Sequence, residues 1–106
     1  MTPDQLKLLA DSEFDRAVLK KNFKESAEAK LNVAFAGGLF VADPVTISFL
    51  NACTEEIVYL KDSYDNPVRV NRLELLTLLK NTYQSTMQSW YEEVEKSNRI
   101  RRAANV

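Results

Sequence analysis

Apolar side chains recur at helical spacing through the last third of the chain, and this pattern predicts one long helix from Asn71 to Arg102. Asn71 suits the N-cap, and Glu74 follows three residues later, as in a capping box. Neither Gly nor Pro occurs after Asn71, so nothing interrupts the helix. A stripe with steps of three and four places six apolar or aromatic residues on one face. Its members are Leu76, Leu79, Tyr83, Met87, Trp90 and Val94.

This helix divides into two parts. Leucines between Leu73 and Leu79 occupy several faces, which predicts a first half surrounded by its own domain. From Tyr83 to Val94 only a narrow stripe remains, so we expect a partner there. The alternative, that the stripe covers only the hairpins and the first helix, stays open. The candidate interaction residues are Tyr83, Met87, Trp90, Tyr91 and Val94.

The length of the helix supports a projecting end. At 1.5 Å per residue it spans roughly 45 Å, whereas a compact domain of this size has a radius of gyration of about 13 Å. We therefore expect it to lie along a partner or to project, with residues of about 95–106 outside the domain.

Self-association is a separate expectation. Leu76, Tyr83 and Trp90 are seven residues apart, and so are Met87 and Val94. This spacing fits a short coiled-coil seam with a second copy. Two heptads are too few to specify an oligomeric state; the residues that interrupt the repeats are Lys80, Ser97 and Arg101.

A first helix is predicted from the N-terminus to about Leu31. Thr2 suits its N-cap and Pro3 its first position, and a restart at Asp11 or Ser12 stays open. Lysines and glutamates alternate along its outer face, which indicates a solvated surface. The apolar positions are Leu6, Leu9, Phe14, Val18, Phe23, Ala27 and Leu31, of which the last three are four apart and share one face.

Two hairpins and a short helix are predicted between these helices. Gly37 and Gly38 separate two short hydrophobic runs, and both can adopt positive φ as central turn residues. Asp43 and Pro44 then begin a helix that we expect to end near Glu55 or Glu56.

The second hairpin follows directly. Its strands are Ile57–Leu60 and Pro67–Val70, joined by residues rich in turn formers. The acids in this turn lack the spacing of a calcium loop, so a plain turn is predicted. The expected fold is α+β: helix, β-hairpin, short helix, β-hairpin and long C-terminal helix.

Composition narrows the function class. The chain has 106 residues, enough for a single domain over 1–106, and a net charge of −1 gives no bulk attraction to nucleic acid or membrane. No segment is apolar enough to span a bilayer and no signal peptide is evident, so synthesis inside the cell is the default expectation. Cys53 is interpreted as a buried structural thiol on the apolar face of the short helix.

Catalytic signatures are missing from the sequence. There is no His and a single Cys. Glu55 and Glu56 are neighbours that point in different directions, and Gly37-Gly38 lacks the Lys of a phosphate loop. We therefore predict no enzyme, no catalytic residues, no metal site and no cofactor.

Two blocks of sequence carry a resemblance. Ala34–Phe40 and Asp43–Ile47 look like a hairpin with an aromatic-x-Gly turn that leads into a short helix, and Tyr64–Leu75 looks like an Asp-Asn turn, a strand and a helix start. Together they resemble a domain family of unassigned function that is widespread in bacteriophage genomes, often in tail, tail-fibre and fibre-assembly proteins. The family often has a Trp in the second hairpin, where this chain offers Tyr59 or Tyr64.

The resemblance, which covers about residues 15–102, implies a phage structural or assembly role. We expect a virion-associated interaction protein at the tail, baseplate or tail-fibre attachment region, made in the host cytoplasm, with tail or fibre proteins as partners. One alternative is an assembly chaperone that is missing from the virion. A second is a small nucleic-acid-binding regulator that uses Arg99, Arg101 and Arg102, although cations at a helix C-terminus explain this cluster more simply.

Overall fold

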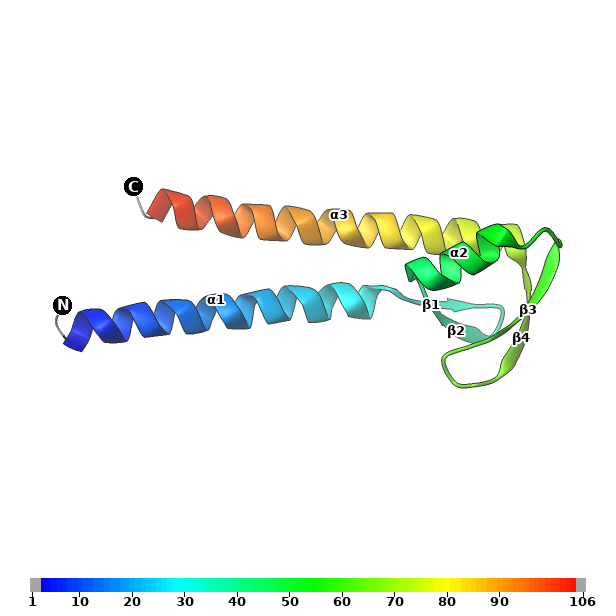
Figure 1. The fold of residues 1–106 in the computed structure, drawn as a ribbon, viewed down its shortest axis with the longest axis horizontal. Coiled ribbons are helices and arrows are strands. Elements are labelled where there is room, and N and C mark those ends of the chain that lie inside the picture. Colours follow the sequence, from blue (N-terminus) through cyan, green and yellow to red (C-terminus); the bar gives the residue numbers. More distant parts are fainter. Residues whose placement is uncertain (1–2, 105–106) are drawn as a thin grey trace.

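The computed structural model describes the backbone of residues 3–104 and the side chains of residues 15–100, 102 and 103. The predicted N-cap Thr2 lies outside the described residues, as do the side chains of Leu6, Leu9 and Phe14. The predicted α+β class and element order are confirmed (Figure 1). The elements are α1 Pro3–Lys30, β1 Asn32–Phe35, β2 Gly38–Val41, α2 Pro44–Ala52, β3 Ile57–Lys61, β4 Pro67–Asn71 and α3 Arg72–Ala104.

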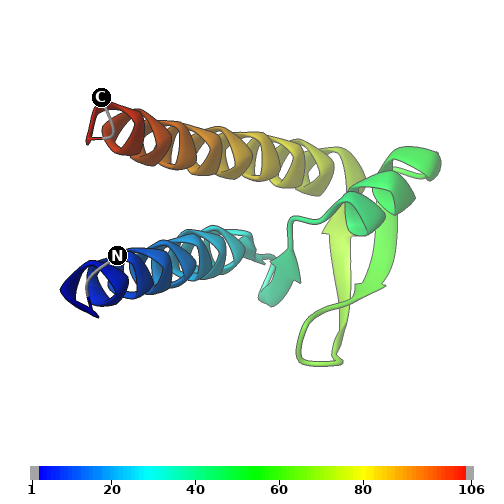
Figure 2. The same cartoon turned by 60° about the vertical axis from the view of Figure 1, so that its left-hand side comes forward.

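The molecule has an elongated shape with two parts. Both hairpins, α2 and the start of α3 gather at one end, which we call the head (residues 31–79). From it α1 and residues 80–104 of α3 extend side by side toward the same side, with their chains running in opposite directions, and we call this pair the stalk (Figures 1 and 2). The extents are 66 × 26 × 19 Å and the radius of gyration is 20.0 Å, against about 13 Å for a compact domain of this length.

The first helix is continuous, so the restart considered at Asp11 or Ser12 does not occur. No Gly or Pro lies in α1 after Pro3, and the chain therefore has no reason to break the ladder of backbone hydrogen bonds. At its end, the Leu31 amide donates to the Glu28 carbonyl at 3.2 Å. This bond satisfies a carbonyl that the helix end leaves without an intrahelical partner.

The head has one apolar core. The hairpins form two separate antiparallel sheets of two strands each, and such hairpins are marginal alone. They pack against the first turns of α3, where Leu75, Leu76 and Leu79 are buried as predicted, whereas Leu73 is 57% exposed. Half-buried side chains surround this core, Tyr83 among them. The buried cluster consists of Phe40, Ala42, Leu50, Val58, Val70, Leu75, Leu76 and Leu79.

The turn of the first hairpin lies one residue earlier than predicted. Its central residues are Ala36 and Gly37, with φ of 51° and 82°, as a tight two-residue hairpin loop requires. Gly38 instead begins β2. A Cβ at Gly38 would lie 2.9 Å from Val68 Cγ2 and 3.3 Å from Asp62 Cβ. The close approach of the second hairpin therefore requires glycine at the strand position and sets the register.

Replacing Gly38 with Ala is expected to lower the free energy of unfolding by about 1–3 kcal/mol, because the added methyl group overpacks the contact with Val68. Ala36→Gly supplies a contrast in the same turn. It should be neutral or stabilising, since glycine adopts positive φ without a steric penalty. Urea unfolding measures both changes. An unaltered midpoint for Gly38→Ala would show that the two hairpins do not need this close approach.

The short helix begins as predicted but ends early. Asp43 Oδ1 accepts a hydrogen bond from the Thr46 amide at 2.7 Å, and Pro44 occupies the first turn. The helix ends at Ala52, so the expected end near Glu55 or Glu56 is wrong. Cys53 follows it in extended conformation and is half-buried against the core, rather than on the helix face.

Arg72 explains why the chain leaves the helix there. Its Nε donates to the Glu55 carbonyl at 2.8 Å and its Nη1 to the Leu50 carbonyl at 3.2 Å. Its own amide donates to the Glu56 carbonyl at 2.9 Å. The start of α3 thus holds the α2–β3 loop in an extended path. Beside it, Asn71 Oδ1 accepts from the Glu74 amide at 3.1 Å, which confirms the predicted N-cap.

Candidate protein-interaction surface of the stalk

The five candidate residues do not share one environment. Tyr83 is half-buried against the head core. Met87 and Trp90 are half-buried further along α3. Tyr91 is 69% exposed and Val94 37% exposed. The predicted stripe therefore combines Tyr83, which packs against the head core, with residues such as Tyr91 that are exposed on the stalk.

The side of α3 that faces α1 is marked by a residue that the sequence pattern missed. Thr86 is 5% exposed and Ala27 of α1 is 4% exposed. Because α1 and α3 are in contact with each other, we infer that each of these two residues is covered by the opposite helix. Leu79 and Thr86 are seven residues apart, so they lie on one face of α3. The predicted shared face of the first helix is confirmed near the head, where Phe23 and Leu31 flank Ala27 as half-buried residues. Ala27 belongs to the predicted apolar face of the first helix, whereas the polar side chain of Thr86 gives no hydrophobic signal.

Larger apolar side chains nearer the tip of the stalk are less well covered. Val18 and Leu19 on α1 are 39% and 40% exposed. Across the stalk, Val94 has a similar exposure and Ile100 is 62% exposed. Among the described stalk side chains the fully buried ones are small, so the pair of helices has no large apolar residue sealed between them.

A segment of α3 without charge adds a second signal. No charged residue occurs from Asn81 to Tyr91, although Lys80 precedes the segment and Glu92 follows it. It contains two Tyr, one Trp and one Met. Protein interfaces are depleted in charge at their centre and enriched in aromatic residues and Met. This absence of charge is readable from the sequence and would have pointed to the same region.

Ion pairs do not hold the stalk together among its described side chains. Lys21–Glu25 and Lys24–Glu28 lie within α1, each at 3.8 Å. On α3, Glu95 pairs with Arg99 at 3.5 Å and with Arg102 at 3.1 Å. Exposed pairs of this kind contribute little to stability. The contact between the helices therefore depends on the packing of their facing side chains.

The basic cluster at the end of α3 is partly neutralised by these pairs. Arg99 and Arg102 both reach Glu95, which lowers the positive field available to a nucleic acid. The side chain of Arg101 lies outside the described part of the chain.

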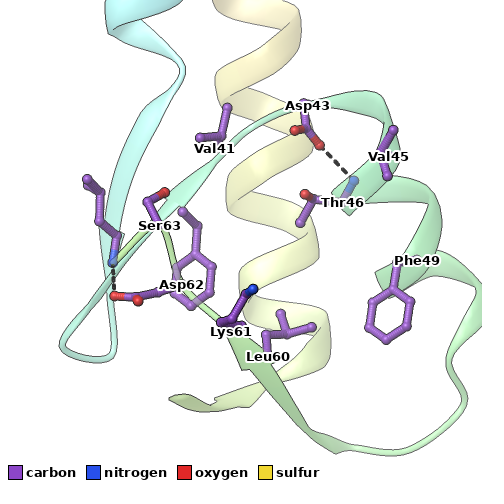
Figure 3. A pocket seen from close by; sticks show the side chains of 11 residues that line it. Val41, Asp43, Val45, Thr46, Phe49, Leu60, Lys61, Asp62 and Ser63 are labelled. Carbon is purple, nitrogen blue, oxygen red and sulfur yellow. Dashed lines mark hydrogen bonds between the residues drawn. The ribbon is translucent and has the colours of Figure 1, made fainter. Parts of the chain in front are cut away.

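The head carries an open hollow of about 430 Å³ between β2, α2 and the β3–β4 turn (Figure 3). Val45 and Phe49 line it and are 78% and 51% exposed. The two carboxylates that line it already accept hydrogen bonds from backbone amides. Asp43 caps α2, and Asp62 accepts from the amides of Leu39 at 3.2 Å, Tyr64 at 3.0 Å and Asn66 at 2.9 Å.

Asp62 joins the two hairpins. Besides its bond to Leu39 of β2, the neighbouring Ser63 amide donates to the Leu39 carbonyl at 2.8 Å. Backbone hydrogen bonds, that of Asn66 above all, hold the pKa of the Asp62 carboxyl below its ordinary value of 3.8, against the opposing effect of burial. The second turn is thus a plain turn, as predicted, whose acid also fixes the first hairpin.

The lowered pKa of Asp62 predicts acid-sensitive stability. Its contribution is complete above the pKa of the unfolded chain, about 3.9, and is lost as pH falls through the lower pKa of the folded state. Asp62→Asn should therefore be destabilising near neutral pH, with a difference from the parent that shrinks below about pH 4. Urea midpoints across this range test it, with the exposed Asp65→Asn as control. A difference that is independent of pH would contradict the assignment.

The described residues offer neither a cluster of metal ligands nor a membrane-spanning helix. No three His, Cys, Asp or Glu side chains gather there in a way that could hold a metal ion. No helix in this part of the chain combines the length and the apolar character needed to cross a membrane.

Comparisons with protein-family models, with curated proteins and with solved structures returned no match. The function must therefore be inferred from the surface of the stalk, which has an uncharged segment with aromatic residues and incompletely covered apolar side chains.

Proposed function

We propose that this protein is a non-enzymatic interaction protein that binds another protein chain through its stalk. The observation that carries the proposal is the contrast between the two parts of α3. Leu75 and Leu79 are fully buried in the head. Trp90 stays half-buried and Tyr91 largely exposed, in a segment without charge. When a partner covers aromatic side chains that are exposed in this way, the free energy falls because apolar surface is removed from water.

The biological setting in this proposal is a bacteriophage tail, baseplate or tail-fibre attachment region. It rests on the resemblance of Ala34–Phe40, Asp43–Ile47 and Tyr64–Leu75 to the phage domain family. A head with its own apolar core on a long two-helix stalk suits a connecting role, because the stalk offers a lengthwise surface.

Particle composition tests the setting. For a virion component, quantitative mass spectrometry of purified particles should find the protein at a fixed ratio to a tail protein. An assembly chaperone would instead be missing from particles and bound to unassembled fibre or tail protein in infected cells. Absence from both fractions would remove the phage assembly role.

A pair of variants tests the surface within the same experiment. Tyr91→Glu places a charge on the exposed aromatic position, whereas Ser85→Glu places the same charge on another exposed face of α3. We expect Tyr91→Glu to reduce incorporation or partner binding and Ser85→Glu to leave it unchanged. Equal behaviour of the two variants would contradict binding through this face of the stalk.

A further inference from the structure

The exposed area of a single chain is too large for a compact monomer. The chain exposes 7908 Å² at a mass of 12.1 kDa, roughly 1,900 Å² more than a compact monomer of that mass exposes. A standard protein interface buries about 800 Å² on each partner, and obligate dimers bury more. One extended interface along the stalk could therefore cover the excess.

A second stripe on α3 is available for such an interface. Lys80, Gln84, Met87, Tyr91 and Val94 follow each other at steps of four and three, so they share one face. This face lies roughly a third of a turn from Leu79, which is buried in the head core, and from Thr86, which we assign to the contact with α1. Tyr91 is 69% exposed and Val94 37% exposed, so α1 leaves much of this face open. Its apolar members lie in or beside the uncharged segment.

Charges at the two ends of this segment indicate which partner fits. Lys80 lies about two helical turns before Met87, and Glu95 lies about two turns after it. Two copies of α3 that cross near Met87 in opposite directions bring Lys80 of each copy beside Glu95 of the other, where Glu95 also pairs with Arg99 and Arg102 of its own helix. Two copies in the same direction would place each charge beside its like, which is unfavourable.

We propose that a second copy of this chain covers the stripe, so that two stalks pack antiparallel around Met87 and Tyr91 with the heads at opposite ends. The interface is then isologous, and both copies contribute the same residues to it. This inference rests on the proposed role of the stalk as a docking surface and names its occupant.

Sedimentation equilibrium on the full chain tests the second copy. We expect a mass of twice 12.1 kDa at micromolar concentrations. Tyr91→Glu should weaken the dimer by tenfold or more (order of magnitude, about 1.4 kcal/mol), and Ser85→Glu should leave it intact. Far-ultraviolet circular dichroism checks that each variant stays folded. A single-chain mass at all concentrations, or a dimer that is unaffected by Tyr91→Glu, would overturn the inference.

Charge reversal tests the direction. Lys80→Glu and Glu95→Lys should each weaken an antiparallel dimer, and the double variant should restore it. A double variant as weak as the singles would overturn the antiparallel order. If the chain is monomeric and Tyr91→Glu still abolishes binding to a tail or fibre protein, the second copy is excluded while the proposed function stands. If the chain neither dimerises nor binds a tail or fibre protein, the second copy and the proposed function are both excluded.

Discussion

Leu79→Ala is expected to lower the free energy of unfolding by about 2–5 kcal/mol, because it removes a fully buried side chain and leaves a cavity. Leu79 belongs to the cluster in which α3 meets both hairpins and α2. The stability of a small domain is about 5–15 kcal/mol in total, so this loss should bring the variant close to unfolding. Urea unfolding followed by circular dichroism measures the change.

A matched control lies two turns earlier on the same helix. Leu73 is 57% exposed, and Leu73→Ala makes the same chemical change without opening a cavity. Its expected effect is within about 0.5 kcal/mol. If both variants lose the same stability, the head core is not where α3 is anchored.

Arg72→Ala should cost about 2–3 kcal/mol, since it removes two charge-assisted hydrogen bonds to backbone carbonyls. Those carbonyls belong to Leu50, at the end of α2, and to Glu55, in the loop that follows. Without the guanidinium they lose their partners, and the loop loses its tie to α3. Thermal or urea unfolding gives the value.

Two further variants separate geometry from charge. Arg72→Lys keeps the charge but cannot reach two carbonyls with one planar fork, so it should restore little of the loss. Arg69→Ala removes an exposed arginine from β4 and should change stability by less than about 0.5 kcal/mol. Full rescue by lysine would show that Arg72 acts through its charge alone.

Local signals in the sequence predicted the helix starts correctly. Asp43 and Asn71 cap the helices that follow them because the capping bond joins residues three apart. The leucines of the first turns of α3 predicted a helix surrounded by its own domain, and Leu75, Leu76 and Leu79 are indeed buried, although Leu73 is 57% exposed.

Features set by distant contacts were predicted less well. The turn at Ala36 and Gly37 is fixed by the approach of Val68 and Asp62 to Gly38, from the other hairpin. The end of α2 is fixed by Arg72, which follows it by twenty residues. No local pattern contains either contact, so neither boundary could be read from its own stretch of sequence.

The candidate surface was predicted in part. A single stripe through Tyr83, Met87 and Trp90 merged two faces of α3. The pairing of α1 with α3 explains why: on α3 we infer the contact at Thr86, whose polar side chain does not register in a hydrophobic pattern. Once that face is occupied, the remaining stripe is centred on Met87 and Tyr91.

The most direct test of whether the stalk is a docking surface is amide hydrogen exchange measured at several protein concentrations. Amides of Leu75–Leu79 should be protected at every concentration, because the head core covers them. Amides of Met87–Val94 should exchange readily in dilute protein and become protected as a second copy associates. Equal protection of both segments, independent of concentration, would show that one chain completes the stalk alone and would contradict its role as a docking surface.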